Sequence, residues 1–312
     1  MGSLGGSPMI RRRAAVLGVV AVVDLALGEL PNRWHPVALL GRAAAYLDRL
    51  LTAEGQRDTA TRGVLLTATA AGLAAGAALG VARGARGRGA AGFLLQALAL
   101  KQTLSIRALF DHAGRVAARL EAGDLAGARA AAAMMVSRRT DDLPPGLVAS
   151  AAIESLAENL SDSVVAPAWW YLAAGLPGAA AYRAVNTLDA MVGYRSRGRF
   201  GMVPARLDDV LNWVPARLTA ASLVLARPLP AVRQVSRLVR DAWSTPSPNA
   251  GWPMAAMAHI LGVRLEKLEH HVLHAAGREP VAADIRRAQR AGALALAATA
   301  LAGATACWRA GE

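Results

Sequence analysis

The sequence predicts an all-α protein, a polytopic integral membrane helical bundle with cytoplasm-facing polar helices and loops. Hydrophobic residues make up 54% of the 312 residues and aromatic residues only 4%, which is typical of helices that pack closely in a bilayer through small side chains. Residues 63–82 form an uncharged run that is long enough to cross the hydrocarbon core. The formal net charge is +13, as expected for basic cytoplasmic loops.

The strong positive charge has three explanations: a nucleic-acid binder, a membrane protein with basic loops, or a site for anionic substrates. Few aromatic residues and scattered arginines argue against nucleic acid, so no nucleic-acid partner is expected. The single cysteine, Cys307, excludes an internal disulfide framework. We therefore expect a multi-pass protein of the cell (inner) membrane, in contact with membrane lipid, whose active site faces the cytoplasm.

The N-terminal region combines a basic stretch with an apolar one. Residues 1–13 are expected to be a disordered basic N-terminus, and residues 14–312 a single membrane-embedded domain. The arginines at 11–13 precede an apolar run that contains Asp24. This order also fits a signal peptide, but the acidic residue favours a retained first helix, where an ionisable group is a functional candidate. His35 further on is either an ordinary helix-start residue or a substrate contact.

Four apolar runs are candidates for membrane segments. Residues 14–28 and 63–82 have basic flanks that predict an in–out–in hairpin. Residues 163–182 are also uncharged, but prolines and a glycine interrupt them, which predicts a broken or re-entrant segment. Residues 291–308 are the expected last membrane helix. The sequence thus predicts four or five spans.

Polar segments separate these runs. Residues 90–133 are predicted to be helical, with a turn at Gly123 and Asp124, and residues 137–145 to be a polar loop. A proline-rich loop is predicted at residues 245–253. His270, His271 and His274 then cluster without a cysteine or an HExxH pattern, which disfavours zinc.

Several standard catalytic motifs are missing from the sequence. It has no GxxxxGK[ST] loop, no GxGxxG after a strand and no GxSxG elbow. A nucleotide would therefore be bound without a familiar phosphate loop.

Carboxylates and amides concentrate between residues 152 and 217. Glu154, Glu158 and Asp162 recur every four residues, which predicts one face of a helix. The other members of the group are Asn159, Asn186, Asp189, Asp208, Asp209 and Asn212. Such oxygen ligands suit Mg²⁺, which usually accompanies phosphate. The alternative interpretation is a series of solvated helix faces.

Seven segments occur in a fixed order between His35 and Val263: HPVALLGR, ALKQTLSIRALFDHA, AIESLAENLSD, VVAPAWW, GAAAYRAVNTLDAMVGY, RFG…ARLDDVLNWVPARLTA and SPNAGWPMAAMA. Together they resemble the CobD/CbiB family of cobalamin biosynthesis. Members of that family are membrane-embedded adenosylcobinamide-phosphate synthases, and the resemblance covers most of the chain.

The resemblance implies an enzyme, a ligase that forms a C–N amide bond with the help of ATP and Mg²⁺. The acid would be one propionate of adenosylcobyric acid, and the amine aminopropanol or aminopropanol O-phosphate. The product would be adenosylcobinamide or its phosphate. Because a carboxylate is a poor electrophile, ATP would convert it to an acyl phosphate. This chemistry needs cations against phosphate, a metal held by carboxylates and a proton acceptor.

The resemblance also suggests roles for individual residues. The residues expected to hold Mg²⁺ and phosphate are Glu154, Glu158, Asp162, Asp208 and Asp209. Catalytic roles are expected for Glu154, Glu158, Asn159, Asp189 and Asn212. Substrate and phosphate binding is expected from His35, Lys101, Arg107, Arg138, Asn186, Arg206, Arg217 and Asn249.

The chain departs from the family pattern at three positions. Arg139 stands where an aspartate is common, Ser150 where an arginine is expected, and Ser163 where glycine is frequent. The first two changes indicate either a swapped ion pair or an altered choice of substrate.

Two other functions fit parts of the sequence. A Mg-dependent membrane prenyl- or phospho-alcohol transferase would also show clustered asparagines and aspartates, but it would ignore corrinoids. A non-catalytic corrinoid carrier or permease would bind the corrin without consuming ATP.

Overall fold

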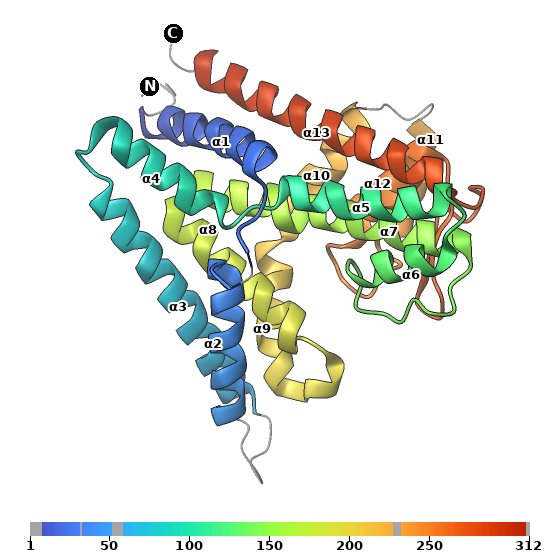
Figure 1. Cartoon of the computed structure of the whole chain (residues 1–312), viewed down its shortest axis with the longest axis horizontal. Helices are drawn as coiled ribbons and strands as arrows, with labels where there is room; N and C mark the ends of the chain where they lie inside the picture. Colours follow the sequence, from blue (N-terminus) through green and yellow to red (C-terminus); the bar gives the residue numbers. More distant parts are fainter. Residues whose placement is uncertain (1–7, 32, 52–58, 227–231, 310–312) are drawn as a thin grey trace. The chain divides into compact units, whose positions relative to one another are not determined.

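The computed structural model describes residues 8–31, 33–51, 59–226 and 232–309, and almost all of its secondary structure is helical (Figure 1). The predicted all-α class is confirmed. Contacts between Cα atoms divide the chain into two compact units, and the single domain stays a prediction. Unit 1 comprises Met1–Ser105, Ala166–Asn212 and Ala304–Glu312, and unit 2 comprises Ile106–Val165 and Trp213–Gly303.

Unit 1 is built on the long helices α3 and α8, which pack against each other and against α9. Its elements are α1 (Pro8–Leu27), α2 (Pro36–Leu51), α3 (Ala60–Gly84), α4 (Gly89–Lys101), α8 (Ala166–Val192), the short η2 (Arg195–Arg197) and α9 (Gly198–Leu211). Gly63 on α3 permits the close packing of α9, because a Cβ atom there would lie 2.4 Å from the Phe200 carbonyl oxygen. Residues 8–13 lie in α1, so the expectation of disorder is wrong for them. Residues 1–7 lie outside the described residues.

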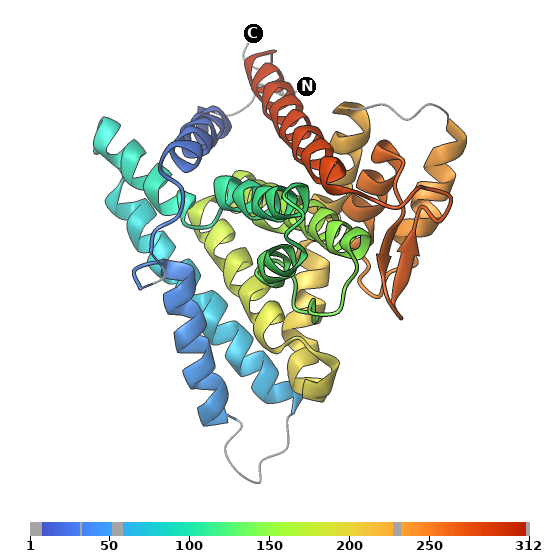
Figure 2. The ribbon, with the colours of Figure 1, turned by 45° about the vertical axis from the view of Figure 1, so that its right-hand side comes forward.

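Unit 2 surrounds the buried helix α7 with further helices and one hairpin. Its elements are α5 (Ile106–Glu121), α6 (Leu125–Ala133), α7 (Pro145–Leu160), the π-helix η1 (Ser161–Val165), α10 (Trp213–Ala226), α11 (Val232–Ala242), α12 (Gly251–Leu261), β1 (Leu265–Lys267), β2 (His271–Leu273) and α13 (Ala282–Arg309), whose last residues belong to unit 1. The antiparallel hairpin pairs Leu265 with Leu273 and lies beside α11 and α12 (Figure 2).

Two predicted segments differ in detail from the structure. The helical stretch 90–133 is divided into α4, α5 and α6, since the chain turns at residues 102–105 as well as at Gly123. The predicted interruption of residues 163–182 is confirmed, because Gly175 adopts φ 71° and kinks α8. A positive φ is readily adopted by glycine, which has no Cβ atom.

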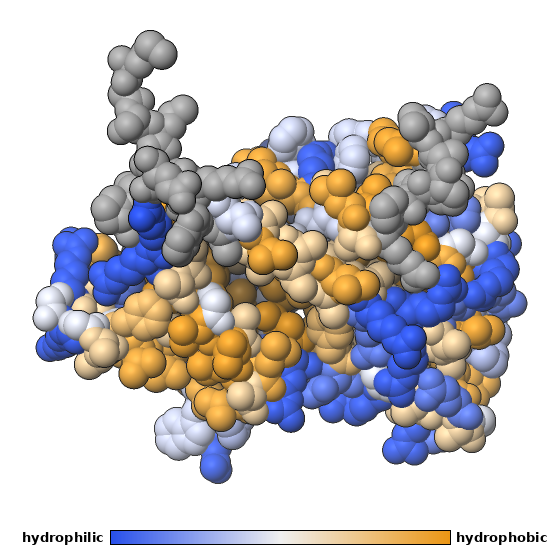
Figure 3. Space-filling model, turned by 90° about the horizontal axis from the view of Figure 1, so that it is seen from above, coloured by the Kyte–Doolittle hydropathy of each residue, from blue (hydrophilic) through white to orange (hydrophobic). Residues whose placement is uncertain are grey.

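One helix among those described, α3, is long and apolar enough to cross a bilayer, judged by its length and composition. Several apolar side chains of α3 are exposed, including Val64, Leu65 and Leu73. Figure 3 shows hydrophobic residues gathered in patches between hydrophilic ones. The other predicted spans do not meet this criterion within the described residues, so the polytopic arrangement stays a prediction.

Candidate functional site

A buried network of carboxylates and amides joins α8 to α9 within unit 1. Asp208 accepts hydrogen bonds from Nδ2 of Asn186 at 3.2 Å and from Nδ2 of Asn212 at 2.9 Å. The Tyr182 hydroxyl donates to Oδ1 of Asn212 at 2.9 Å, and Arg183 donates to Oδ1 of Asn186 at 3.3 Å. Residues 182, 183 and 186 share one side of α8, and residues 208 and 212 lie one turn apart on α9, so helical spacing brings all five together.

Burial and neighbouring carboxylates raise the pKa values of the aspartates at this network. Burial raises the pKa of Asp208 to about 7, and the charge of Asp189 contributes to that rise. Burial also raises the pKa of Asp189 to about 6, with a contribution from Asp209. Asp209 itself has a raised pKa because of burial, which the nearby Arg206 offsets in part, at 3.7 Å. Raised pKa values of clustered carboxylates are typical of functional sites.

The side chains of this network are of the types that bind a cation. Carboxylate and amide oxygens are the ligands that Mg²⁺ prefers, and a cation would favour the ionised forms of Asp189 and Asp208, whose pKa values are raised first by burial and then by neighbouring carboxylates. In the arrangement described, however, no three His, Cys, Asp or Glu side chains among the described residues are placed to hold a metal ion together. The amides of Asn186 and Asn212 donate to both oxygens of Asp208, and their own oxygens accept from Arg183 and Tyr182, so they orient the carboxylate of Asp208.

A second buried charge cluster lies in unit 2, on α7. Glu154 accepts from Arg138 at 3.1 Å through Oε2 and pairs with Nε2 of His271 at 3.2 Å through Oε1. The side chains of Glu154 and His271 are only 7% and 5% exposed. Both oxygens of this predicted metal ligand are thus engaged by basic groups. The contact between His271 and Glu154 has no signal in the sequence, because the two residues lie 117 positions apart.

The acidic residues predicted to share one helix face fall in two elements. Glu154 and Glu158 keep the four-residue repeat within α7, and Asp162 lies in the π-helix η1 that continues it. Asn159 is held locally, since its Oδ1 accepts from the Ser163 hydroxyl at 3.1 Å.

Arg139 and Ser150, the two positions that depart from the family pattern, have separate surroundings in unit 2. The side chain of Arg139 is 84% exposed and lies 3.6 Å from Asp141. Ser150 is fully buried, and its hydroxyl accepts from the Glu266 amide at 2.7 Å and lies 3.3 Å from the Glu266 carbonyl. Ser150 therefore fastens the hairpin to α7, and the interpretation as a swapped ion pair is wrong.

A third polar cluster occupies the region around the start of α2 in unit 1. Nζ of Lys101, which is almost fully buried, lies 2.9 Å from Glu29 and 3.1 Å from Asp24. His35 and Ser105 also hydrogen-bond to Glu29, each at 2.9 Å. Lys101 and His35 were predicted to bind substrate, and the structure places both against carboxylates of the protein. Glu29 was missed because a single glutamate beside an apolar run gives no sequence signal.

The stability of this cluster should depend on pH through Glu29. Burial opposes the ionisation of Glu29, but hydrogen bonds from His35, Lys101 and Ser105 outweigh it and lower the pKa to about 2. The lowered pKa of Glu29 stabilises the folded state at pH values above its unfolded-state pKa near 4.5. This stabilisation is lost as the pH falls towards 2. Glu29→Gln should therefore destabilise the protein by about 3 kcal/mol at pH 7.

Thermal unfolding at pH 7, 5 and 3 checks this prediction. The deficit of Glu29→Gln relative to the unmodified protein should be full at pH 7 and 5 and reduced at pH 3. The exposed Glu121→Gln, which removes a surface pair with Arg286, is the matched control and should leave the melting temperature unchanged. A deficit that is equal at pH 7 and pH 3 would contradict an ionised Glu29.

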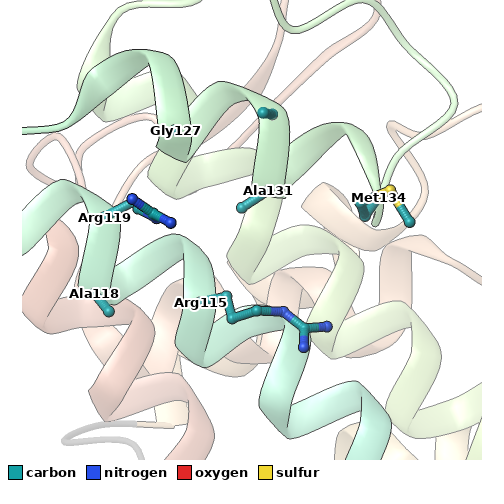
Figure 4. Close-up of a pocket in the computed structure, with 7 residues that line it drawn as sticks. Arg115, Ala118, Arg119, Gly127, Ala131 and Met134 are labelled. Carbon is teal, nitrogen blue, oxygen red and sulfur yellow. The ribbon is translucent and has the colours of Figure 1, made fainter.

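Two predicted binding residues meet in unit 2, at the start of α10. Arg217 donates to Oδ1 of Asn249 at 3.1 Å and to the Trp213 carbonyl at 2.7 Å. The remaining predicted arginines lie at the surface: Arg107 is 45% exposed beside Asp111, and Arg206 is 76% exposed. A groove of about 390 Å³ between α5 and α6 (Figure 4) is lined by other residues: Arg115, Ala118, Arg119, Gly127, Ala130, Ala131 and Met134.

These features define an all-helical protein with one membrane-length helix and a buried network of carboxylates and amides. The chain belongs to the CobD/Cbib protein family, whose profile matches residues 17–299. The resemblance seen in the sequence is thus confirmed.

Several curated relatives are similar to the chain along most of its length. The "Cobalamin biosynthesis protein CobD" of Rhodobacter capsulatus is 43% identical over 302 residues, covering 94% of this chain and 95% of the relative. That of Brucella melitensis is 39% identical, covering 86% and 89%. The "Probable cobalamin biosynthesis protein CobD" of Methanothermobacter thermautotrophicus is 40% identical, covering 83% and 86%. No solved structure matches the chain.

Proposed function

We propose that this chain is a biosynthetic enzyme of the cobalamin pathway that joins aminopropanol or its O-phosphate to a propionate of adenosylcobyric acid. Membership of the CobD/Cbib family supports the pathway, and the relatives named for cobalamin biosynthesis agree with it. The observation that carries the chemistry is the network around Asp208, where buried carboxylates keep pKa values near neutrality beside amide donors.

The reaction we propose has two steps. A propionate oxygen attacks the terminal phosphorus of ATP, which gives an acyl phosphate and ADP. The amine nitrogen then attacks the acyl carbon, inorganic phosphate leaves, and the nitrogen loses a proton. The second step needs a proton acceptor that is effective near neutral pH.

The network around Asp208 matches these needs. With a pKa of about 6, a carboxylate oxygen of Asp189 is suited to take the proton from the amine. Oδ1 and Oδ2 of Asp208 are oriented by Asn186 and Asn212, and with Asp209 they would hold Mg²⁺. When bound there, Mg²⁺ would neutralise phosphate charge during transfer.

Helix α3 would anchor the protein in the membrane. Its composition, the apolar side chains exposed along it and the arginines that follow it support an inner-membrane location, with the basic loop in the cytoplasm. The further spans, which residues 14–28, 163–182 and 291–308 would supply, belong to the same proposal.

The test is ATP consumption by the detergent-purified protein with adenosylcobyric acid and Mg²⁺. Aminopropanol and aminopropanol O-phosphate are supplied in separate reactions, and a reaction without amine is the control. Amine-dependent ADP release with a corrinoid mass gain equal to amide formation is expected with one of them. Tight corrinoid binding without turnover in either reaction would replace the ligase with a carrier.

A further inference from the structure

Three tryptophans from three segments of unit 2 surround the guanidinium of Arg217. Its Cζ atom lies 4.2 Å from the ring centroid of Trp213 on α10, 4.7 Å from that of Trp252 on α12, and 5.8 Å from that of Trp243 in the loop before α12. The rings of Trp243 and Trp252 meet edge to face, with centroids 6.0 Å apart. A guanidinium over an indole face is a favourable cation–π contact, so Arg217 binds the three rings together.

Hydrogen bonds fix the position of Arg217 within this cluster. It donates to the carbonyl of Trp213 at 2.7 Å, to Oδ1 of Asn249 at 3.1 Å and to the carbonyl of Pro248 at 3.4 Å. These bonds connect α10 to the loop that carries Trp243. The guanidinium therefore has its hydrogen-bond donors engaged by the protein, and the exposed parts of the cluster are the indoles of Trp213 and Trp243.

Two of the three indoles are unusually open to solvent for such large apolar groups. Trp213 is 54% exposed and Trp243 is 58% exposed, although each has one contact with the same fixed cation. A rigidly held, exposed tryptophan offers a large contact area with little loss of side-chain entropy on binding. Exposed apolar surface of this kind commonly marks a binding site.

We propose that Trp213 and Trp243, held by Arg217, form a stacking surface for the corrin ring of the substrate. This inference rests on the proposed function. A corrin is a conjugated macrocycle wider than a single indole, so two exposed indoles from neighbouring segments would each contact part of it. Its cobalt centre gives the ring a positive core, which the electron-rich faces of indoles attract.

Equilibrium dialysis of the detergent-purified full chain against adenosylcobyric acid, without ATP and amine, measures this binding directly. Trp213→Leu and Trp243→Leu should each raise the dissociation constant by roughly tenfold, in line with the contribution of one stacked ring. Trp213→Phe should keep most of the affinity, because a flat ring remains. Trp34→Leu is the matched control and should bind normally, since Trp34 is also exposed, at 67%, and also lies over an arginine, Arg33.

Each other outcome overturns the inference. Unchanged corrinoid affinity in both leucine variants would remove the stacking role, while amide ligation by the same proteins would leave the proposed function intact. If the leucine variants bind a non-hydrolysable ATP analogue more weakly and bind the corrinoid normally, the surface is an adenine site. Reduced quenching of tryptophan fluorescence by acyl-brominated phospholipids in the variants, with corrinoid binding unchanged, would assign the indoles to the membrane interface. If the unmodified protein binds no corrinoid, the proposed function fails first.

Discussion

Asp208→Asn is expected to lower kcat/KM for amide ligation by at least about a hundredfold while making the protein more stable above pH 7. The loss follows from removing one negative oxygen from the network that would bind Mg²⁺ and phosphate, an electrostatic contribution of this order in many enzymes. Ligation is measured as corrinoid product formed at saturating ATP. Asp142→Asn, which changes an exposed side chain in the loop before α7, should keep full activity.

The gain in stability follows from the direction of the pKa shift. Burial raises the pKa of Asp208 to about 7, so the folded state holds its proton more tightly than the unfolded state. The resulting destabilisation is absent below the unfolded value near 3.8 and grows as pH rises to about 7. The destabilisation by ionised Asp208 amounts to at most about 4 kcal/mol. The gain in Asp208→Asn is smaller by about 1 kcal/mol, because asparagine forms a mismatched hydrogen bond in this network.

Thermal unfolding of Asp208→Asn at pH 8 and pH 4 therefore separates charge from structure. The melting temperature should exceed that of the unmodified protein by several degrees at pH 8 and should not exceed it at pH 4. Asp209→Asn is the matched comparison, because Arg206 already offsets the charge of Asp209, and its gain should be smaller. A lower melting temperature for Asp208→Asn at both pH values would show that Asp208 is structural, and any loss of activity would then need no catalytic role.

Arg138→Met is expected to destabilise the protein by about 3–5 kcal/mol, because it leaves the buried carboxylate of Glu154 without its guanidinium. The pair lies at 3.1 Å with side chains 17% and 7% exposed, so water compensates little for the loss. Urea-induced unfolding of the detergent-purified variants gives the difference in free energy. His271 remains as the second partner of Glu154, which places the expected loss towards the lower end of that range.

The neighbouring residue supplies the control for this prediction. Arg139→Met removes an arginine that is 84% exposed, 3.6 Å from Asp141, and should change stability by less than about 0.5 kcal/mol. The double variant Arg138→Met with Glu154→Met should recover most of the loss, because an apolar pair of similar volume replaces both charges. Equal effects of Arg138→Met and Arg139→Met would refute the importance of burial at Glu154.

Local patterns in the sequence predicted the elements well. Apolar periodicity and length gave the helices, glycine and proline gave the turns at Gly123 and before α12, and Gly175 with Pro177 gave the interruption of α8. The family resemblance likewise needs only the order of short segments. Such features depend on neighbours within a few residues, which is why they can be read before the fold is known.

Partners far apart in the chain could not be predicted in this way. The sequence marked Asp208, Asn186 and Asn212 as one group, and helical spacing on α8 and α9 brings them into one network. It also marked Glu154 as a metal ligand and Lys101 as a phosphate contact, and the structure gives them His271, Arg138, Asp24 and Glu29 as partners.

The sequence by itself determined that this protein is helical, that α3 has the length and composition of a membrane helix, and that it belongs to its family. Only the tertiary structure decided which charged groups pair with opposite charges, as Glu154 does, and which are buried beside like charges, as Asp208 is. The same is true of the tryptophans around Arg217, which three separate segments contribute. The reason is physical: residue type fixes the charge of a side chain, but burial and partners distant in sequence fix how strongly that charge is felt.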